Sequence, residues 1–480
     1  MIPLSLAHLA RVSGGRLTGI TEADAEQLVI DGPVVTDSRE CGPGGLYIAR
    51  VGEQADGHDF IPQALEAGAL AAMTTRVVDG VVCIVVDDIQ DGFAALARGV
   101  VDAARDLTVI GITGSSGKTS TKDLLGQVLA ADAPTIAPQG SYNSEVGVPL
   151  TVTRITPQTR YLVVEMGARG AGHITYLTEI APPDISVVLN VGTAHLGEFG
   201  SREAIATAKS EIVSALDSSG LAVLNHDDPA VRAMAEVAPG RVVTVSASGD
   251  PAADLRAVEV ELDAASRPSF TIVSEEAPFR VTLPLHGIHH VGNALAVVAV
   301  ARECGIPDEV IASAFRSSRS LSRWRMEVTE RPNGVIIVND AYNANPDSMR
   351  AALDALAVMA EGRRGIAVLG TMLELGENSD AEHAEVGRYA LAGGVDLLVC
   401  VGAGGPAIAA GAEGHADRCH VVADADAAYD LLKGEIRPGD VVLFKSSRDA
   451  GLRHLGDRLA EDASTAADPD QEGSATCSPS

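Results

Sequence analysis

Short, mostly apolar runs recur along the chain, and longer segments of mixed polarity separate them. In the middle of the chain the clearest runs are TVIGIT (108–113), YLVVEM (161–166), ISVVLNV (185–191) and LAVLN (221–225). Helical patterns lie between these runs, notably at 118–130 and 201–216. Mostly apolar strands without an alternating polar face, separated by helices, predict βαβ units whose parallel sheet is covered on both faces.

Two further regions show the same alternation. The N-terminal region predicts strands at 45–49 and 81–86 and helices at 60–68 and 92–104. The region after Arg323 predicts strands at 335–340, 365–371, 396–402 and 440–446. Residues 241–285 differ, because their short alternating runs indicate an antiparallel insert, which a helix at 290–304 follows.

These regions predict an α/β protein of three domains: residues 1–106, then 107–322 with a parallel sheet and the small antiparallel insert, then a Rossmann-like domain at 323–462. The remaining residues, 463–480, are acidic and rich in small side chains. That composition predicts a disordered tail.

Composition and charge narrow the function classes. The chain has 480 residues, 46% of them hydrophobic, and a formal net charge of −29. So acidic a protein is a poor candidate for binding nucleic acid, because that affinity comes from cationic side chains on phosphates. No apolar run approaches the ~18–20 residues that span a bilayer, and the N-terminus lacks the basic start of a signal peptide. Six widely spaced cysteines fit a reduced, cytoplasmic protein.

The strongest motif is GITGSSGKTS (111–120), between a buried strand and a helix. Ile112 stands where the GxxxxGK[ST] pattern has its first glycine, but the strand–loop–helix context is that of a phosphate-binding loop. Lys118 can reach the β- and γ-phosphates of ATP, and the Thr119 hydroxyl can bind Mg²⁺. We expect Lys118 to face solvent until ATP binds. Kinases, GTPases, motor ATPases and ligases share this loop, so it does not name the reaction.

Polar residues follow two other strands of the same predicted sheet. Glu165 ends the strand at 161–166, and His195 follows the strand at 185–191. Because the carboxyl ends of parallel strands border the ligand crevice, we expect both side chains there, with the carboxylate facing Mg²⁺. Lys209 lies on a predicted helix, and read alone it is a solvated surface lysine.

Seven segments, in order, resemble the ATP-dependent Mur ligases of peptidoglycan synthesis: GITGSSGKTS, EMGARGAGHI, NVGTAHLGEFGS, AKSEI, HGIHHVGNALAV, NDAYNANPDSM and KSSR. The resemblance extends from about residue 30 to residue 460. It implies a first domain for the UDP end of the substrate, a central ATPase domain, and a third domain that closes on it. It also implies ATP and two Mg²⁺ ions as ligands.

The resemblance also implies roles for particular residues. The catalytic residues would be Lys118, His195, Lys209 and Arg325. The nucleotide would be held by Gly114, Ser115, Ser116, Gly117, Lys118, Thr119, Ser120, Asn293, Arg325, Asp340, Asn343 and Asn345. Thr119 and Glu165 would bind one Mg²⁺, and His195 a second together with Lys209, the lysine that is carbamylated in this family. The other substrates would contact Asp37, Ser38, Arg39, Asn143, Glu374 and His383.

Within the family, DAYNANPDSM and GTMLELGENSDAEH resemble the member that joins D-alanyl-D-alanine to UDP-N-acetylmuramoyl tripeptide through an acyl phosphate. We expect these two small molecules as partners of a monomer. The diamino-acid-adding relative carries a DNPR-type sequence that this chain lacks. The first domain argues against a folylpolyglutamate synthase. A P-loop switch or regulatory ATPase is the alternative from another class.

Overall fold

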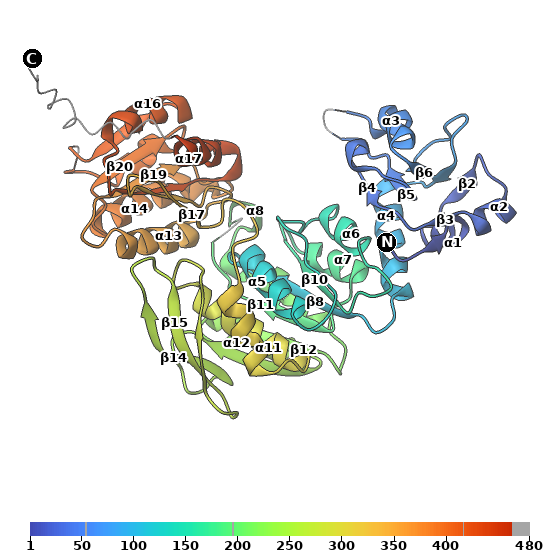
Figure 1. The fold of residues 1–480 in the computed structure, drawn as a ribbon, viewed down its shortest axis with the longest axis horizontal. Coiled ribbons are helices and arrows are strands. Elements are labelled where there is room, and N and C mark those ends of the chain that lie inside the picture. The colour runs from blue at the N-terminus through green and yellow to red at the C-terminus, as the bar shows by residue number, and fades with distance from the viewer. Residues whose placement is uncertain (53–54, 194–195, 416, 463–480) are drawn as a thin grey trace, which may run out of the picture.

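The computed structural model describes residues 1–52, 55–193, 196–415 and 417–462. It has three α/β regions, each with its own sheet, and the first and last lie toward opposite ends of an elongated molecule (Figure 1). The predicted fold class is thus confirmed. The predicted tail at 463–480 lies outside the described residues. Within the described ranges, no helix is both long and apolar enough to cross a membrane.

The N-terminal region has a five-stranded sheet in the order β2-β7-β6-β5-β4 and a separate β1–β3 pair. Its strands are β1 (Leu4–Ser5), β2 (Arg16–Thr18), β3 (Val29–Ile30), β4 (Val34–Val35), β5 (Gly45–Ile48), β6 (Ala69–Thr74) and β7 (Cys83–Val85). Its helices are α1 (Leu6–Val12), α2 (Glu22–Gln27), α3 (Ile61–Glu66) and α4 (Ile89–Ala103). Helix α4 carries Phe93 and Leu96 into a core that continues beneath the central sheet.

The central region has a nine-stranded sheet in the order β16-β15-β14-β13-β12-β11-β8-β10-β9. Its strands are β8 (Thr108–Thr113), β9 (Thr135–Ile136), β10 (Tyr161–Glu165), β11 (Ile185–Val188), β12 (Leu221–Asn225), β13 (Arg241–Ser246), β14 (Leu255–Leu262), β15 (Pro268–Val273) and β16 (Phe279–Thr282). Its helices are α5 (Lys118–Ala130), α6 (Gly147–Val152), α7 (His173–Ile180), α8 (Leu196–Phe199), α9 (Arg202–Ser214), α10 (Pro229–Arg232), α11 (His290–Glu303) and α12 (Asp308–Ser317).

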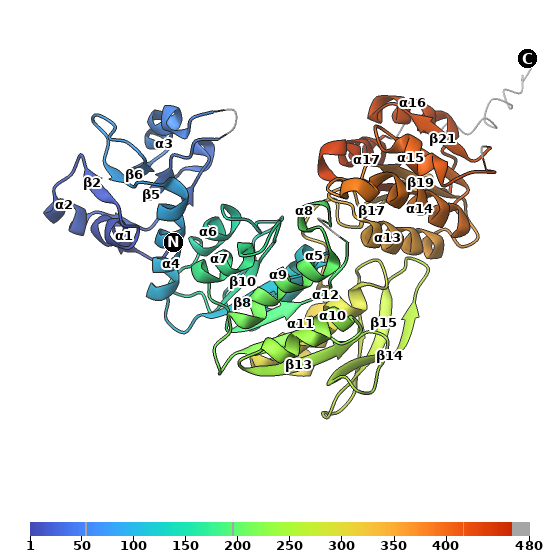
Figure 2. The same ribbon diagram turned by 180° about the vertical axis from the view of Figure 1, so that it is seen from behind.

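Successive side chains along the central strands point to opposite faces of this sheet, so each face has its own hydrophobic core. Val109 and Val164 belong to the core that the first region shares, whereas Ile110 and Val163 belong to a second core beneath α5 and α11. Helices α5, α11 and α12 cover one face (Figure 1), and α9 and α10 cover the other (Figure 2). Burial of both faces explains why these strands are mostly apolar, with polar residues such as Glu165 and Asn225 at their carboxyl ends.

The antiparallel insert is shorter than predicted. Strands β14, β15 and β16 are antiparallel to one another. Strand β13, however, pairs in parallel with β12, and β14 begins in parallel with β13. The antiparallel prediction is therefore wrong for β13. The crossover through α10 returns the chain in the same direction, as a helical connection between parallel strands does.

The third region has a six-stranded sheet in the order β17-β18-β22-β19-β20-β21, parallel except for β17. Its strands are β17 (Glu327–Glu330), β18 (Ile336–Asn339), β19 (Gly365–Gly370), β20 (Leu397–Val401), β21 (Cys419–Val422) and β22 (Val441–Lys445). Its helices are α13 (Pro346–Met359), α14 (Ser379–Ala392), α15 (Gly405–Ala410), α16 (Ala425–Glu435) and α17 (Leu452–Glu461). The first turn of α13 faces the central region near the end of β8.

Candidate active site

The loop between β8 and α5 has the backbone of a phosphate-binding loop. Gly114 has φ 156° and Gly117 has φ 83°, a conformation that side-chain-bearing residues rarely adopt. A Cβ atom on Gly117 would lie 3.0 Å from Asn293 Oδ1, so only glycine fits there comfortably. Helix α5 begins at Lys118, and its free N–H groups and dipole favour an anion at the loop.

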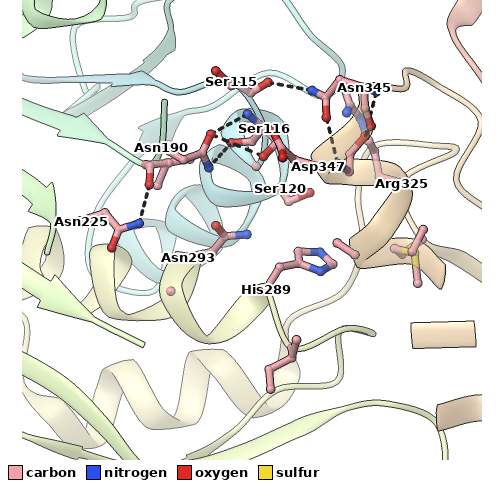
Figure 3. A pocket seen from close by; sticks show the side chains of 18 of the residues that line it. Ser115, Ser116, Ser120, Asn190, Asn225, His289, Asn293, Arg325, Asn345 and Asp347 are labelled. Atoms are coloured by element: carbon pink, nitrogen blue, oxygen red, sulfur yellow. Dashed lines mark hydrogen bonds between the residues drawn. The ribbon is translucent and has the colours of Figure 1, made fainter. Parts of the chain in front are cut away.

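Asn190, just after β11, holds this loop in shape. Its Oδ1 accepts a hydrogen bond from Ser116 N–H (2.9 Å), and its Nδ2 donates to Ser116 O (3.2 Å) (Figure 3). The Ser115 hydroxyl accepts from Gly192 N–H (2.9 Å). Sequence reasoning missed Asn190. Its position at the end of a buried parallel strand, the signal used for His195, could have found it.

The Lys118 side chain turns back onto the backbone of the phosphate loop. Its Nζ donates a hydrogen bond to Gly114 O (2.7 Å), so the expectation that it faces solvent before ATP binds is wrong. Burial lowers the pKa of Lys118, and the Arg325 charge lowers it further while Glu165 opposes them. The amine thus already points into the loop, where a phosphate would replace the Gly114 carbonyl as its partner.

Glu165 is the centre of a buried cluster of oxygen atoms. Its Oε2 accepts from the Thr119 hydroxyl (2.9 Å), and its Oε1 accepts from Ser141 Oγ (2.9 Å) and Asn143 Nδ2 (2.8 Å). Sequence reasoning missed Ser141. Carboxylate, hydroxyl and amide oxygens are the hard ligands that Mg²⁺ prefers, so these residues fit the ion. Among the described residues, no group of three or more His, Cys, Asp or Glu could hold a metal. His195 lies outside them.

Lys209 is buried on α9, with 5% of its surface exposed. Burial moves the pKa of its amine well below the usual lysine value, and the nearby Lys118 charge lowers it further. In the described part of the chain, the amine has no hydrogen-bonded partner. The interpretation of Lys209 as a solvated surface lysine is therefore wrong, because the sequence pattern did not reveal how deeply α9 packs.

The third region reaches the phosphate loop directly. Arg325 Nη2 donates to the Thr119 hydroxyl (3.2 Å), and Asn345 Nδ2 lies 3.5 Å from Ser115 O. The Arg325 guanidinium also lies over the Tyr342 ring, 4.3 Å from its centroid. Thr119 and Arg325, each predicted to hold the nucleotide, thus lie in contact although they belong to different regions.

A cavity of about 300 Å³ lies between the central and third regions, beside the loop (Figure 3). Its walls include most of the residues predicted to hold the nucleotide: Ser115, Ser116, Gly117, Ser120, Asn293, Arg325, Asp340, Asn343 and Asn345. The Asn293 Nδ2 is buried without a partner among the residues that the structure describes, which is unusual for an amide and fits a group that awaits a ligand. Burial lowers the pKa of the neighbouring His289, which therefore stays neutral at neutral pH.

Lys445, at the end of β22, also lines this cavity, and sequence reasoning did not single it out. Its buried amine lies 2.5 Å from Asp340 Oδ2 and donates to Asn343 O (3.2 Å). The other Asp340 oxygen accepts from Met326 N–H (3.0 Å). Lys445 thus fixes both the carboxylate and the backbone of the segment that follows β18.

Replacing Lys445 with methionine should lower the free energy of unfolding by about 3 kcal/mol, because the Asp340 charge would remain buried without its partner. Thermal or urea unfolding measures the change. Arg388→Met is the matched control, since it breaks an ion pair with Glu385 on the exposed face of α14 and should change little. An equal effect of the two substitutions would contradict the buried-pair argument.

The residues predicted to bind the UDP end lie in the N-terminal region, apart from this cavity. Arg39 and Asp37 form an ion pair (2.6 Å) in which Arg39 is 78% exposed. Hydrogen bonds from Arg39 lower the pKa of Asp37 to about 2. The Ser38 hydroxyl donates to Gln63 Oε1 (2.8 Å). The arginine is therefore held by its neighbour yet open to solvent.

The two residues predicted to meet the acceptor are Glu374, in the loop after β19, and His383, near the start of α14. Glu374 has φ 65°, and its carbonyl accepts from Gly197 N–H (3.1 Å) of the central region. His383 is 1% exposed; its Nε2 accepts from Met372 N–H (2.9 Å) and its Nδ1 faces Ser379 O (2.7 Å). Both ring nitrogens are occupied by backbone groups. In this structure His383 shapes the loop and presents no free nitrogen to a substrate.

Comparisons with known proteins agree with this geometry. Three family models match: "Mur ligase family, catalytic domain" at 33–99, "Mur ligase middle domain" at 112–301, and "Mur ligase, glutamate ligase domain" at 324–448. The UDP-N-acetylmuramoyl-tripeptide–D-alanyl-D-alanine ligase of Mycobacterium tuberculosis is 48% identical, with 96% of this chain and 98% of the relative covered.

Solved structures of similar proteins show the same arrangement. MurF from Acinetobacter baumannii has a TM-score of 0.84 at 30% identity, covering 96% of this chain and 99% of its own. MurF ligase from Thermotoga maritima, solved in complex with ADP, has a TM-score of 0.77 at 30% identity, covering 90% and 97%. The chain therefore belongs to the Mur ligase family, among relatives named UDP-N-acetylmuramoyl-tripeptide–D-alanyl-D-alanine ligases.

Proposed function

We propose that this protein is the ATP-dependent ligase that joins D-alanyl-D-alanine to UDP-N-acetylmuramoyl tripeptide in peptidoglycan synthesis. The observation that carries the proposal is the contact of Arg325 with Thr119 beside the phosphate loop. It brings a cation of the third region beside the loop where the γ-phosphate of ATP would lie, in a chain nearly half identical to an enzyme of that name. We also propose a monomer as the active form.

The proposed domain boundaries lie after residues 106 and 322. The division of the strands among separate sheets supports them. The first domain would hold the UDP end through Asp37, Ser38 and Arg39. Asn143, next to Glu165, would meet the peptide carboxylate, and the loop that contains Glu374 would face the acceptor.

The reaction must turn a carboxylate into an electrophile. The terminal carboxylate of the tripeptide attacks the γ-phosphorus of ATP, the bond to the β-phosphate oxygen breaks, and ADP leaves. The product is an acyl phosphate, whose phosphate is a good leaving group. The neutral amine of the dipeptide then attacks the acyl carbon, the C–O bond breaks, phosphate departs, and the amine loses its extra proton.

The residues of this chain supply positioning and charge. Loop N–H groups from Gly114 to Thr119 hold the phosphates, and the Lys118 and Arg325 charges offset the repulsion between the two anions that must meet. Asn293 would face the nucleotide, and Asp340 would contact its ribose. Closure of the third domain over the cavity would keep water from the acyl phosphate.

Mg²⁺, held by Thr119 and Glu165 and, as a second ion, by His195 and carbamylated Lys209, would supply positive charge along the phosphates. Carbamylation converts a cation into an anionic oxygen ligand. The buried, uncharged state favoured for Lys209 supports this modification, because only a neutral amine reacts with CO₂. His195 rests on the family pattern alone.

The discriminating experiment is phosphate release from ATP across UDP-N-acetylmuramoyl peptides of different length, with and without D-alanyl-D-alanine. The proposal expects release only when tripeptide and dipeptide are both present. Release without either would indicate a regulatory ATPase instead.

Acceptor choice gives a separate prediction. The protein should refuse meso-diaminopimelate or lysine as acceptor by ~10⁴-fold or more, because a mismatched acceptor leaves buried polar groups unpaired. The loop at 370–383 contains no arginine to grip a distal carboxylate as a bidentate pair. The assay compares UDP-muramoyl dipeptide plus a diamino acid with UDP-muramoyl tripeptide plus D-alanyl-D-alanine. Faster product formation with the first pair would assign the chain to the preceding step.

A further inference from the structure

Helix α5 lies along the connecting segment, residues 318–326, which joins α12 to β17 and carries Arg325. Three α5 residues spaced by four contact three segment residues: Gln127 contacts Arg319, Asp123 contacts Ser322, and Thr119 contacts Arg325. Residues four apart lie on one face of a helix. The helix that begins at the phosphate loop therefore sets the register of the segment that brings Arg325 to that loop.

The two outer contacts are made to the backbone of the segment. Gln127 Oε1 accepts from Arg319 N–H (3.0 Å), and Gln127 Nε2 donates to Arg319 O (3.0 Å), so one amide holds both backbone groups of one residue. Asp123 Oδ2 accepts from Ser322 N–H (3.0 Å). Neither contact depends on the side chain at the segment position.

Asp123 is itself fixed in place. Its Oδ1 lies 2.8 Å from the ammonium of Lys122, and both side chains are buried. The same ammonium donates to the carbonyls of Pro138 and Gly140, and Gly140 N–H donates to Ser322 Oγ (2.9 Å). The Lys122–Asp123 pair thus anchors two parts of the chain: the connecting segment and the loop that leads to Ser141 in the Glu165 cluster.

The backbone on either side of Arg325 needs such support. Trp324 and Met326 have φ of 58° and 50°, the left-handed region that bulky residues avoid. Their N–H groups bond Glu327 (2.9 Å) and Asp340 (3.0 Å). Such a conformation persists only where its surroundings hold it.

We propose that Gln127 and Asp123 are positioning residues: they register the connecting segment on α5 so that the Arg325 guanidinium meets Thr119 and the γ-phosphate of ATP. The inference rests on the ligase function proposed above. Neither side chain lines the nucleotide cavity. Both act through Arg325, and a displacement of about 1 Å at a reacting group is enough to slow a reaction strongly.

The test is Gln127→Ala in the full-length protein. We expect kcat to fall about tenfold, because both hydrogen bonds from the Gln127 amide to Arg319 are lost and Arg325 is then less well positioned, while the Kd for ATP stays within about twofold. Gln158→Ala, the same substitution at an exposed position of the central domain, is the matched control and should leave both constants unchanged.

A double-mutant cycle separates positioning from a general structural effect. In an Arg325→Ala background, Gln127→Ala should cause no further loss of kcat, because the group it positions is gone. An equal tenfold loss in both backgrounds, or weaker ATP binding with kcat unchanged, would overturn the positioning role. Thermal melting shows whether Asp123→Asn folds. If it folds, it should also lower kcat and leave the Kd for ATP unchanged. If it does not fold, the Gln127 double-mutant cycle is the test. A wild-type protein without dipeptide-dependent phosphate release would overturn the ligase function and this role together.

Discussion

Replacing Lys118 with alanine should abolish ligation while the fold stays intact. The amine is the nearest cation to the loop that would hold the β- and γ-phosphates, and its loss should remove about 3 kcal/mol of charge stabilisation, or about a hundredfold in rate. Among the described residues its amine hydrogen-bonds to Gly114 O, which can bond to water instead. Phosphate release and dipeptide ligation measure the loss, and circular dichroism checks the fold.

The control for this prediction is Lys433→Ala, on the exposed side of α16. Its amine lies over the Tyr429 ring and far from the phosphate loop in the fold, so activity should not change. A Lys118→Ala protein that keeps more than about a tenth of the wild-type rate would exclude the role of Lys118 in charge stabilisation.

Replacing Lys209 with alanine should leave the protein nearly inactive, and short carboxylates such as acetate should restore part of the activity by supplying the missing oxygens. Because burial and the Lys118 charge lower the pKa of Lys209, more of the amine is neutral at neutral pH than in an ordinary lysine. Lower pH protonates the amine and removes the form that reacts with CO₂. Activity of protein freed of CO₂ should therefore recover with bicarbonate, and recover less as pH falls.

Mass spectrometry under native conditions or NMR with isotope-labelled bicarbonate can detect the carbamate directly. Lys433→Ala again serves as the control, because its exposed amine should show neither loss nor rescue. An unmodified Lys209 together with normal activity of Lys209→Ala would exclude the carbamate.

Much of the central fold could be predicted because its strands are buried on both faces. The runs at 108–113 and 221–225 match β8 and β12 in full, and the helix at 118–130 matches α5. Strand β13 was predicted wrongly, since RVVTVS is compatible with either pairing direction and only the crossover through α10 decides between them. Pairing direction is a property of the chain path rather than of the local pattern.

Some residues of the site could likewise be predicted from the sequence, and others could not. Glu165 was predicted from its place at a strand end, and the structure brings it to Thr119. Lys445 also ends a strand, yet its importance comes from its contact with Asp340, which precedes it by more than a hundred residues. The burial of Lys209 could not be predicted either, because a single lysine on a helix gives no sign of which face of the helix is buried. The roles of these residues depend on contacts between segments far apart in the sequence, which sequence spacing does not show.

The distribution of lysines has a practical consequence. The chain has five lysines and 31 arginines. Lys122, Lys209 and Lys445 are buried, Lys118 points into the phosphate loop, and Lys433 is the one that is exposed. Amine-reactive dyes or surfaces would therefore find a single lysine handle on α16, remote from the nucleotide cavity. Once the α-amine of Met1 is blocked, the folded protein can be labelled or tethered at Lys433 in one orientation, which suits measurements of domain movement on single molecules.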